Sequence, residues 1–133
     1  MGLLDKLKSS LEGDPFDKAS NIQISFDFDP PVSEEKFRYK VIEVSKILVE
    51  SDYCEKASGL QRLCALDKKS QKKIVGVDMQ CYGIKHKGRA NLCIAVVNLV
   101  GQFKKIGIKA EINTERTGVL PENYQGLFGQ LKK

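Results

Sequence analysis

The chain lacks most of the residue groups that build catalytic or metal centres. It has one histidine, His86, which excludes a zinc site made of several imidazoles. Its four cysteines are separated by 9, 16 and 11 residues, so there is no CxxC pair, and no Gly-x-Ser-x-Gly elbow is present. Cys81 with His86 would be the main nucleophilic couple, but a strand through residue 81 turns the thiol inward, away from a histidine in the next loop. We therefore expect a non-enzymatic protein without a metal site or cofactor.

Long apolar runs are also missing. The longest, at residues 92–97, has six residues, against about 20 needed to cross a bilayer. The opening residues are charged from Asp5 onward and lack the apolar stretch of a secretory signal. The sequence thus predicts a cytoplasmic protein that does not bind membranes. Cysteines stay reduced there and usually pack as small buried apolar side chains. This is the expectation for Cys54, Cys64, Cys81 and Cys93.

The chain is long enough for one domain. Its 133 residues can bury a core without disulfide or metal support, and they leave no room for a second domain. We divide it into an N-terminal amphipathic helix and linker at 1–15, a core at 20–114 and a C-terminal extension at 115–133. One face of the predicted N-terminal helix carries Leu3, Leu4, Leu7 and Leu11.

Positive charge is concentrated in one part of the sequence. Residues 1–60 contain eight Lys or Arg and twelve Asp or Glu, whereas residues 61–133 contain fourteen and five, which gives the net charge of +5. Between Lys68 and Lys109 there are ten basic residues and one acid, Asp78. Such a concentration attracts anionic partners but does not identify them.

The first third of the core predicts a strand followed by a helix. Apolar and polar residues alternate over 22–28, which is typical of a half-buried strand, and Pro30-Pro31 is expected to end it. Ser33 and the two glutamates after it predict the start of a helix over 34–50. Its apolar face has helical spacing: Phe37, Val41, Val44 and Leu48.

The segment 57–83 is expected to form a hairpin with a charged tip at 67–73. Its second arm alternates clearly from Val75 to Tyr82. The first arm is rich in Leu, Ala, Gln and Arg, which favour helices, although Gly59 interrupts the helical face. For residues 57–67 the sequence is compatible with either a strand or a helix.

A second helix is predicted at 90–106, and it is apolar nearly all round. It therefore needs cover on more than one side, from the amphipathic ends Leu3–Leu11 and Tyr124–Leu131 or from a second copy of the protein. Gly107 suits the end of this helix, and a last strand follows at 108–112. The order predicts an α+β fold: a split β-α-β-β-α-β (ferredoxin-like) antiparallel sheet with two helices on one face and short amphipathic helices at both ends.

Two groups of basic residues are candidates for anion binding. The first lies in the loop 83–89 before the second helix, where helix-start amides favour anions, and contains Lys85, His86, Lys87 and Arg89. The loop lacks the Lys-Ser/Thr ending of a Walker motif, so the alternatives are an anion contact or a solvated basic turn. The second group is a basic rim where the hairpin tip meets the end of the second helix: Lys68, Lys69, Lys72, Lys73, Lys104, Lys105 and Lys109. An ordinary solvated loop is the alternative there.

The open face of the predicted sheet is acidic. Asp27, Asp29 and Asp78 share it, and they are either a hard-cation site or a solvated face. Tyr82 is the only aromatic residue with the phase of this face, so stacking of single-stranded nucleic acid on the sheet is disfavoured.

These observations predict a binding module that engages an anionic macromolecule, with nucleic-acid backbone favoured, through the basic surface within residues 68–109. Lysines without a planar fork suit phosphates better than base edges. The alternative is a structural or regulatory interaction domain. It would assemble with itself, or bind an acidic protein, through helix 90–106 and the amphipathic ends.

Overall fold

The computed structural model describes residues 15–64 and 73–121. Several predicted features lie outside the described residues: the helix at Leu3–Leu11, the hairpin-tip residues Lys68, Lys69 and Lys72, the side chain of Cys64, and the helix at Tyr124–Leu131.

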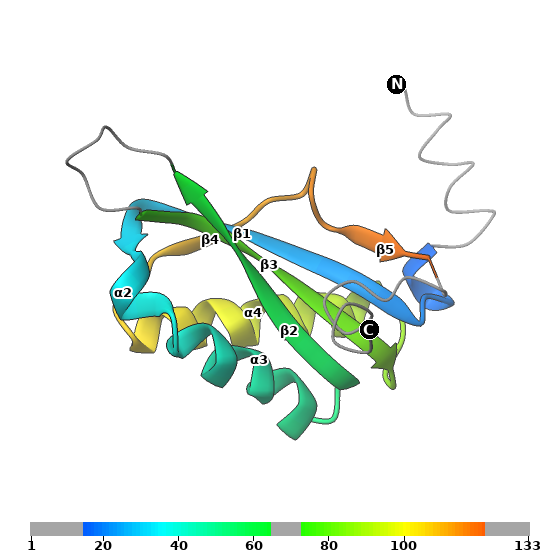
Figure 1. Ribbon diagram of the computed structural model, residues 1–133. Coiled ribbons are helices and arrows are strands. Elements are labelled where there is room, and N and C mark those ends of the chain that lie inside the picture. Colours follow the sequence, from blue (N-terminus) through cyan, green and yellow to red (C-terminus); the bar gives the residue numbers. More distant parts are fainter. Residues whose placement is uncertain (1–14, 65–72, 122–133) are drawn as a thin grey trace, which may run out of the picture.

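The described strands form one antiparallel sheet with the order β2-β3-β1-β4 (Figure 1). A short fifth strand, β5, pairs with β1 on the same edge as β4, nearer the start of β1. The bounds are β1 Asn21–Ser33, β2 Cys54–Cys64, β3 Lys73–Ile84, β4 Ala110–Ile112 and β5 Gly118–Leu120. The strand β5 lies in the range that sequence analysis treats as a C-terminal extension.

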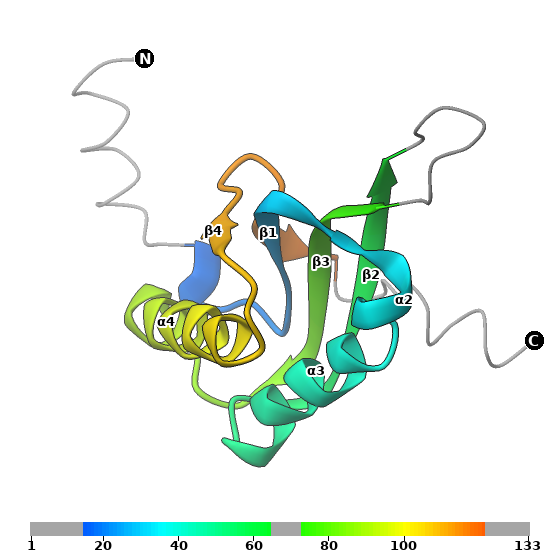
Figure 2. The ribbon, with the colours of Figure 1, turned by 90° about the vertical axis from the view of Figure 1, so that its left-hand side faces the viewer.

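Two helices, α3 Lys40–Glu50 and α4 Arg89–Lys105, cover one face of the sheet (Figure 2). Two shorter elements are η1 Pro15–Asp17 and α2 Glu34–Phe37. The order β1-α3-β2-β3-α4-β4 on this sheet is the split β-α-β-β-α-β arrangement, so the predicted ferredoxin-like α+β fold is confirmed. In the described part of the chain, no helix has the length and apolar character needed to cross a membrane.

Four phenylalanines form the centre of the core between sheet and helices. Phe26 and Phe28 point inward from β1 and pack edge to face on Phe103 of α4, with ring centroids 5.4 and 5.3 Å apart. Phe37 joins them 5.2 Å from Phe28. Each such aromatic pair adds about 1 kcal/mol to the effect of burial alone. The alternation in the sequence of β1 therefore fixes the face on which the helices pack.

The first strand is longer than predicted. It continues through Pro30 and Pro31, where sequence analysis ended it. Pairing with β3 is irregular between Asp27 and Val32, and it resumes with Val32 opposite Ile74. Because proline has no amide hydrogen to donate, a strand tolerates it where the hydrogen-bond ladder is interrupted.

The predicted single helix at 34–50 is wrong, because a turn at Arg38 and Tyr39 divides it into α2 and α3. Ser33 occupies the cap position of α2 but makes no side-chain cap hydrogen bond. The buried residues on both sides of the turn still have helical spacing, from Phe37 in α2 to Val41 in α3. Hydrophobic periodicity runs across the break and therefore did not reveal it.

The first arm of the hairpin is a strand, despite its helix-favouring composition. Residues of β2 pair with β3 from Cys54 opposite Ile84 to Cys64 opposite Lys73. Gly59 has a packing reason to lie there, because a β-carbon at this position would collide with Val41 of α3. The glycine thus lets α3 approach the sheet closely, and sheet pairing overrides local helix propensity.

The helix α4 matches the predicted second helix, and Gly107 after it has the left-handed φ of 79° expected at that position. Its inner face is buried against the sheet: Leu92, Ala95, Leu99 and Phe103. On the outer face Ile94 and Val97 are 67% and 72% exposed. The sequence predicted that α4 is covered on more than one side. Among residues 15–64 and 73–121, no segment covers its outer face.

Substitution of Gly59 by alanine tests the packing of α3 on the sheet. Gly59→Ala should lower the free energy of unfolding by about 1–3 kcal/mol, the usual cost of an overpacked core. Gly101→Ala is the matched control, because the added methyl has no neighbour within 4 Å among residues 15–64 and 73–121, and glycine disfavours a helix interior. It should raise stability by about 1 kcal/mol. Urea denaturation followed by circular dichroism measures both, and equal effects of the two variants would contradict the packing argument.

Candidate anion-binding surface

The described basic candidates lie at two ends of the sheet. Lys73 begins β3 and Lys85 follows its end, so this strand of 12 residues separates them. The "loop group" comprises Lys85, His86, Lys87 and Arg89 beside the start of α4. The "rim group" comprises Lys73 at the start of β3, together with Lys104, Lys105 and Lys109 at and after the end of α4. Figure 1 shows that α4 runs between these two ends. A compact ligand therefore contacts only one group.

Two members of the loop group lie against the same carboxylate. The Lys85 ammonium donates a hydrogen bond of 2.8 Å to Asp52, and Nε2 of His86 is 3.5 Å from the other oxygen of that carboxylate. The Asp52 hydrogen bond and charge raise the pKa of Lys85. These contacts hold the loop against the end of α3 and offset part of its positive charge.

Arg89 also has a packing contact. Its guanidinium lies 4.9 Å from the ring centroid of Phe16 in η1, a cation–π arrangement. The amide of Gly88 donates to the Phe16 carbonyl at 2.9 Å, so an amide at the start of α4 is already occupied by the chain itself. The loop group is therefore tied to neighbouring elements, and Lys87 is its exposed lysine that makes no ion pair with another described residue.

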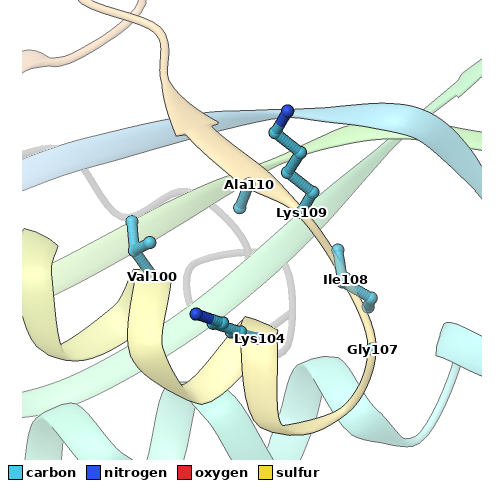
Figure 3. A pocket seen from close by; sticks show the side chains of 6 residues that line it. All are labelled: Val100, Lys104, Gly107, Ile108, Lys109 and Ala110. Atoms are coloured by element: carbon cyan, nitrogen blue, oxygen red, sulfur yellow. The ribbon is translucent and has the colours of Figure 1, made fainter.

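Two members of the rim group, Lys104 and Lys109, line a cavity of about 460 Å³ at the end of α4 (Figure 3). We call this cavity the α4–β4 cleft; it is lined by Val100, Lys104, Gly107, Ile108, Lys109 and Ala110. Lys104 comes from the last turns of α4, and Lys109 comes from the segment that leads into β4. An apolar cavity with a few charged groups at its margin is the usual form of a binding site for a partly apolar ligand.

The cleft adjoins the edge of the sheet. In the described sheet β4 is the last strand in the order and pairs only with β1. The carbonyl of Lys109 accepts from Asp29 and the amide of Asn113 donates to Ser25, so these alternate residues face β1. By the alternation of an antiparallel ladder, the backbone polar groups of Ala110 and Ile112 point away from β1. They form an edge to which an extended chain could hydrogen-bond.

The opposite, open face of the sheet carries a charge network. We call Asp27, Arg62, Asp78 and Arg116 the open-face network. Arg62 lies 2.5 Å from Asp27 and 3.3 Å from Asp78. Arg116 lies 2.6 Å from the second oxygen of Asp78, whose side chain is only 3% exposed. The hydroxyl of Ser25 adds a hydrogen bond of 2.6 Å to Asp78.

Arg62 reaches the network by crossing a glycine. It lies opposite Gly76 in the pairing of β2 with β3, and Gly76 lies opposite Asp27 in the pairing of β3 with β1. A β-carbon on Gly76 would collide with the guanidinium of Arg62 and with the Phe26 carbonyl. The missing side chain therefore opens the path by which Arg62 bridges three strands.

Arg116 reaches the network from an excursion of the chain between β4 and β5. Both of these strands pair with β1, and residues 113–117 between them arch past Ser25. The amide of Asn113 donates to the Ser25 carbonyl at 2.7 Å, and the amide of Ser25 donates to the Thr117 hydroxyl at 2.9 Å. Strand pairing along this edge is thus interrupted at Ile24 and Ser25 of β1, and Arg116 extends from there over Asp78.

The network keeps both aspartates ionised. Burial acts to raise the pKa of Asp78, but hydrogen bonds from Arg116 and Ser25 and the charges of Arg116 and Arg62 outweigh it and lower the pKa. For Asp27, the hydrogen bond from Arg62 is the largest cause of its lowered pKa. Two carboxylates are therefore balanced by two guanidinium groups.

This balance decides between the two interpretations of the acidic face. Asp27 and Asp78 are satisfied by arginine, while Asp29 is exposed further along β1. Across residues 15–64 and 73–121, no three His, Cys, Asp or Glu side chains gather as metal ligands. Among the described residues, the open face therefore holds no cluster of metal ligands. Two of its three aspartates are paired with arginine instead of being solvated. The sequence did not predict that Arg62 and Arg116 pair with these aspartates. The one local signal was Gly76, which leaves room for the side chain of Arg62 opposite it.

No described cysteine forms a nucleophilic couple with His86. Cys81 is fully buried, and its interaction with Cys54 together with burial raises the pKa of its thiol, whereas His86 is exposed. Cys54 and Cys81 are free and buried, as predicted. Cys93 is exposed, contrary to the expectation of burial, because α4 turns it toward its outer face.

No protein-family model matches this sequence, and no curated protein matches it. Among solved structures, the fold is similar to that of CutA from Synechococcus elongatus PCC7942, with a TM-score of 0.38 and 10% sequence identity. The similarity covers 75% of this chain and 81% of the CutA chain. No residue role is transferred from it.

Replacement of the buried carboxylate tests the open-face network. Asp78→Asn should cost about 3 kcal/mol of unfolding free energy at neutral pH, because two arginines lose their buried partner. The folded-state pKa of Asp78 is lowered, so its stabilisation is complete above the unfolded value of about 3.9 and is lost as pH falls through the folded value. The difference in free energy of unfolding between Asp78→Asn and the parent should therefore become smaller below about pH 4.

Urea denaturation at neutral and acidic pH measures this gap. Asp29→Asn is the matched control, because it removes an exposed carboxylate of the neighbouring strand β1 and should change stability by less than about 0.5 kcal/mol. A gap for Asp78→Asn that is the same at both pH values would contradict the role given to its charge.

Proposed function

We propose that this protein is a non-enzymatic binding module whose partner is an acidic polypeptide segment, bound in extended form at the α4–β4 cleft. The observation that carries the proposal is the cleft itself. It combines an apolar lining, two lysines and an adjoining strand edge in one place. The loop group has a structural role instead, because Lys85 and Arg89 are held by Asp52 and Phe16.

An extended polypeptide fits all three features of the cleft. Its backbone adds to the edge of β4 through main-chain hydrogen bonds, as in other cases of strand addition. Alternate side chains of an extended chain point the same way, so apolar ones enter the cleft beside Val100 and Ile108. Acidic side chains of the segment approach Lys104 and Lys109, which gives charge complementarity.

Nucleic-acid backbone, the anion favoured by the sequence, needs only the lysines and makes no use of the apolar lining or of the strand edge. It stays a prediction, as do self-assembly and a cytoplasmic location. The two kinds of anion differ in salt dependence, because phosphate contacts release condensed counterions and their affinity falls steeply with added salt. A partly apolar contact is less sensitive to salt.

Titration with both kinds of anion tests the proposal. Fluorescence polarisation is measured with a short labelled peptide that alternates Glu and Val, and with labelled single- and double-stranded oligonucleotides, at low and high salt. We expect the peptide to bind and to keep most of its affinity at high salt. The double variant Lys104→Gln/Lys109→Gln should bind it about tenfold more weakly, as two exposed charge contacts of up to about 1 kcal/mol each suggest.

Lys85→Gln/Lys87→Gln is the matched control, because it removes the same charge from the loop group. At about 0.1 M salt it should leave peptide affinity within about twofold. The 17 residues of α4 separate the loop group from the cleft by roughly 25 Å, which exceeds the Debye length of about 10 Å. Oligonucleotide binding without peptide binding would replace the proposal with nucleic-acid recognition. Binding of every probe weaker than ~10⁻⁴ M at low salt would overturn both.

A further inference from the structure

The outer face of α4 carries a row of small and apolar side chains. Cys93 and Ile94 occupy one turn, Val97 the next, and Gly101 the one after. Ile94 and Val97 are 67% and 72% exposed, and no atom of the described residues lies within 4 Å of a β-carbon placed on Gly101. We call these four residues the α4 stripe. Its spacing is that of a helix surface that packs against another helix.

The chain contains a segment with the complementary pattern. Leu3, Leu4, Leu7 and Leu11 recur at helical spacing with charged residues between them. As a helix, the segment 3–11 would span about 12 Å between its first and last residues, the same as the α4 stripe from Cys93 to Gly101. The two apolar faces are thus matched in length.

The described chain begins beside one end of the stripe. Phe16 of η1 is held at the start of α4 by the hydrogen bond of its carbonyl with Gly88 and by the ring contact with Arg89. In Figure 2, η1 lies next to α4. The three residues 12–14 separate the leucine segment from Pro15, and they reach at most about 10 Å. The segment is therefore tethered within reach of the stripe.

The tether also sets the direction of the segment. With Leu11 nearest to the start of α4 and Leu3 nearest to Gly101, the segment would run antiparallel to α4, which is favourable for the two helix dipoles. In that arrangement Glu12 would lie toward the end of α4 that carries Lys87 and Arg89, and Asp5 toward the end that carries Lys104. Opposite charges would then meet at both ends of the row.

We propose that residues 3–11 form a helix that docks antiparallel on the α4 stripe of the same molecule. The inference goes beyond the proposed function and does not rest on it, because the stripe lies along the outer face of α4 and the α4–β4 cleft at its end. Residues 3–11 would then cover the exposed apolar side chains of α4, Ile94 and Val97.

The exposed thiol of Cys93 reports on docking. In a full-length Cys64→Ser parent, Cys93 is the accessible described thiol, because Cys54 and Cys81 are buried. Its rate of reaction with Ellman's reagent should be about tenfold lower than in the same chain with Leu4→Glu and Leu7→Glu, which place charge on the docking face. Leu127→Glu/Leu131→Glu is the matched control and should react as slowly as the parent.

The number of reacting thiols separates release from unfolding. One fast thiol in Leu4→Glu/Leu7→Glu indicates local release, whereas three indicate that the fold is lost. If the double variant is unfolded, Leu7→Ser is used instead, because it is a milder change. It should also make Cys93 react faster than in the parent.

Three results would overturn the proposal. The first is a parent in which Cys93 already reacts as fast as a free thiol, or a leucine variant that reacts no faster than the parent. The second is protection that the C-terminal variant removes, which would assign the cover to residues 124–131. The third is protection that disappears on dilution, which would assign it to a second copy of the chain.

Discussion

The pairing of the buried Asp78 carboxylate with two arginines is the interaction on which the open face of this protein depends. Both helices lie on the other side of the sheet, so no helix covers Asp78 within the described residues. Its charge is instead enclosed by Arg62 from β2 and by Arg116 from the excursion between β4 and β5. A buried charge persists only when it is paired and hydrogen-bonded, and this pair joins β1, β2, β3 and the β4–β5 edge.

The same principle separates the structural positive charges from those free to bind a partner. Arg62 and Arg116 balance the open-face aspartates, Lys85 pairs with Asp52, and Arg89 stacks on Phe16. The lysines at the end of α4 make no ion pair with another described residue and stand beside an apolar cleft. Net charge alone therefore overstates the basic surface, because several of its members neutralise acids within the fold.

Much of the fold could be predicted from periodicity, and the errors have particular causes. Alternation in 22–28 and 75–82 and the apolar spacing in 90–106 gave the right elements, because each pattern matches the geometry of a single strand or helix. The turn at Arg38–Tyr39 was missed because the buried spacing continues across it. The division of the basic residues into two groups was also predictable, because the alternating strand between them is clear in the sequence. The apolar cleft beside Lys104 and Lys109 was not, since it depends on how the end of α4 packs beside β4.

The sequence by itself determined the order of the elements, the inward face of β1 and β3, and the excess of basic residues after position 60. Only the tertiary structure decided which charges meet, because Arg62 and Asp78 come together through strand register, and Arg116 through an interruption of the edge. It also decided that the outer row of α4 faces away from the sheet. Local patterns record how each element is buried, whereas pairing between distant residues is set by the register and connections of the assembled sheet.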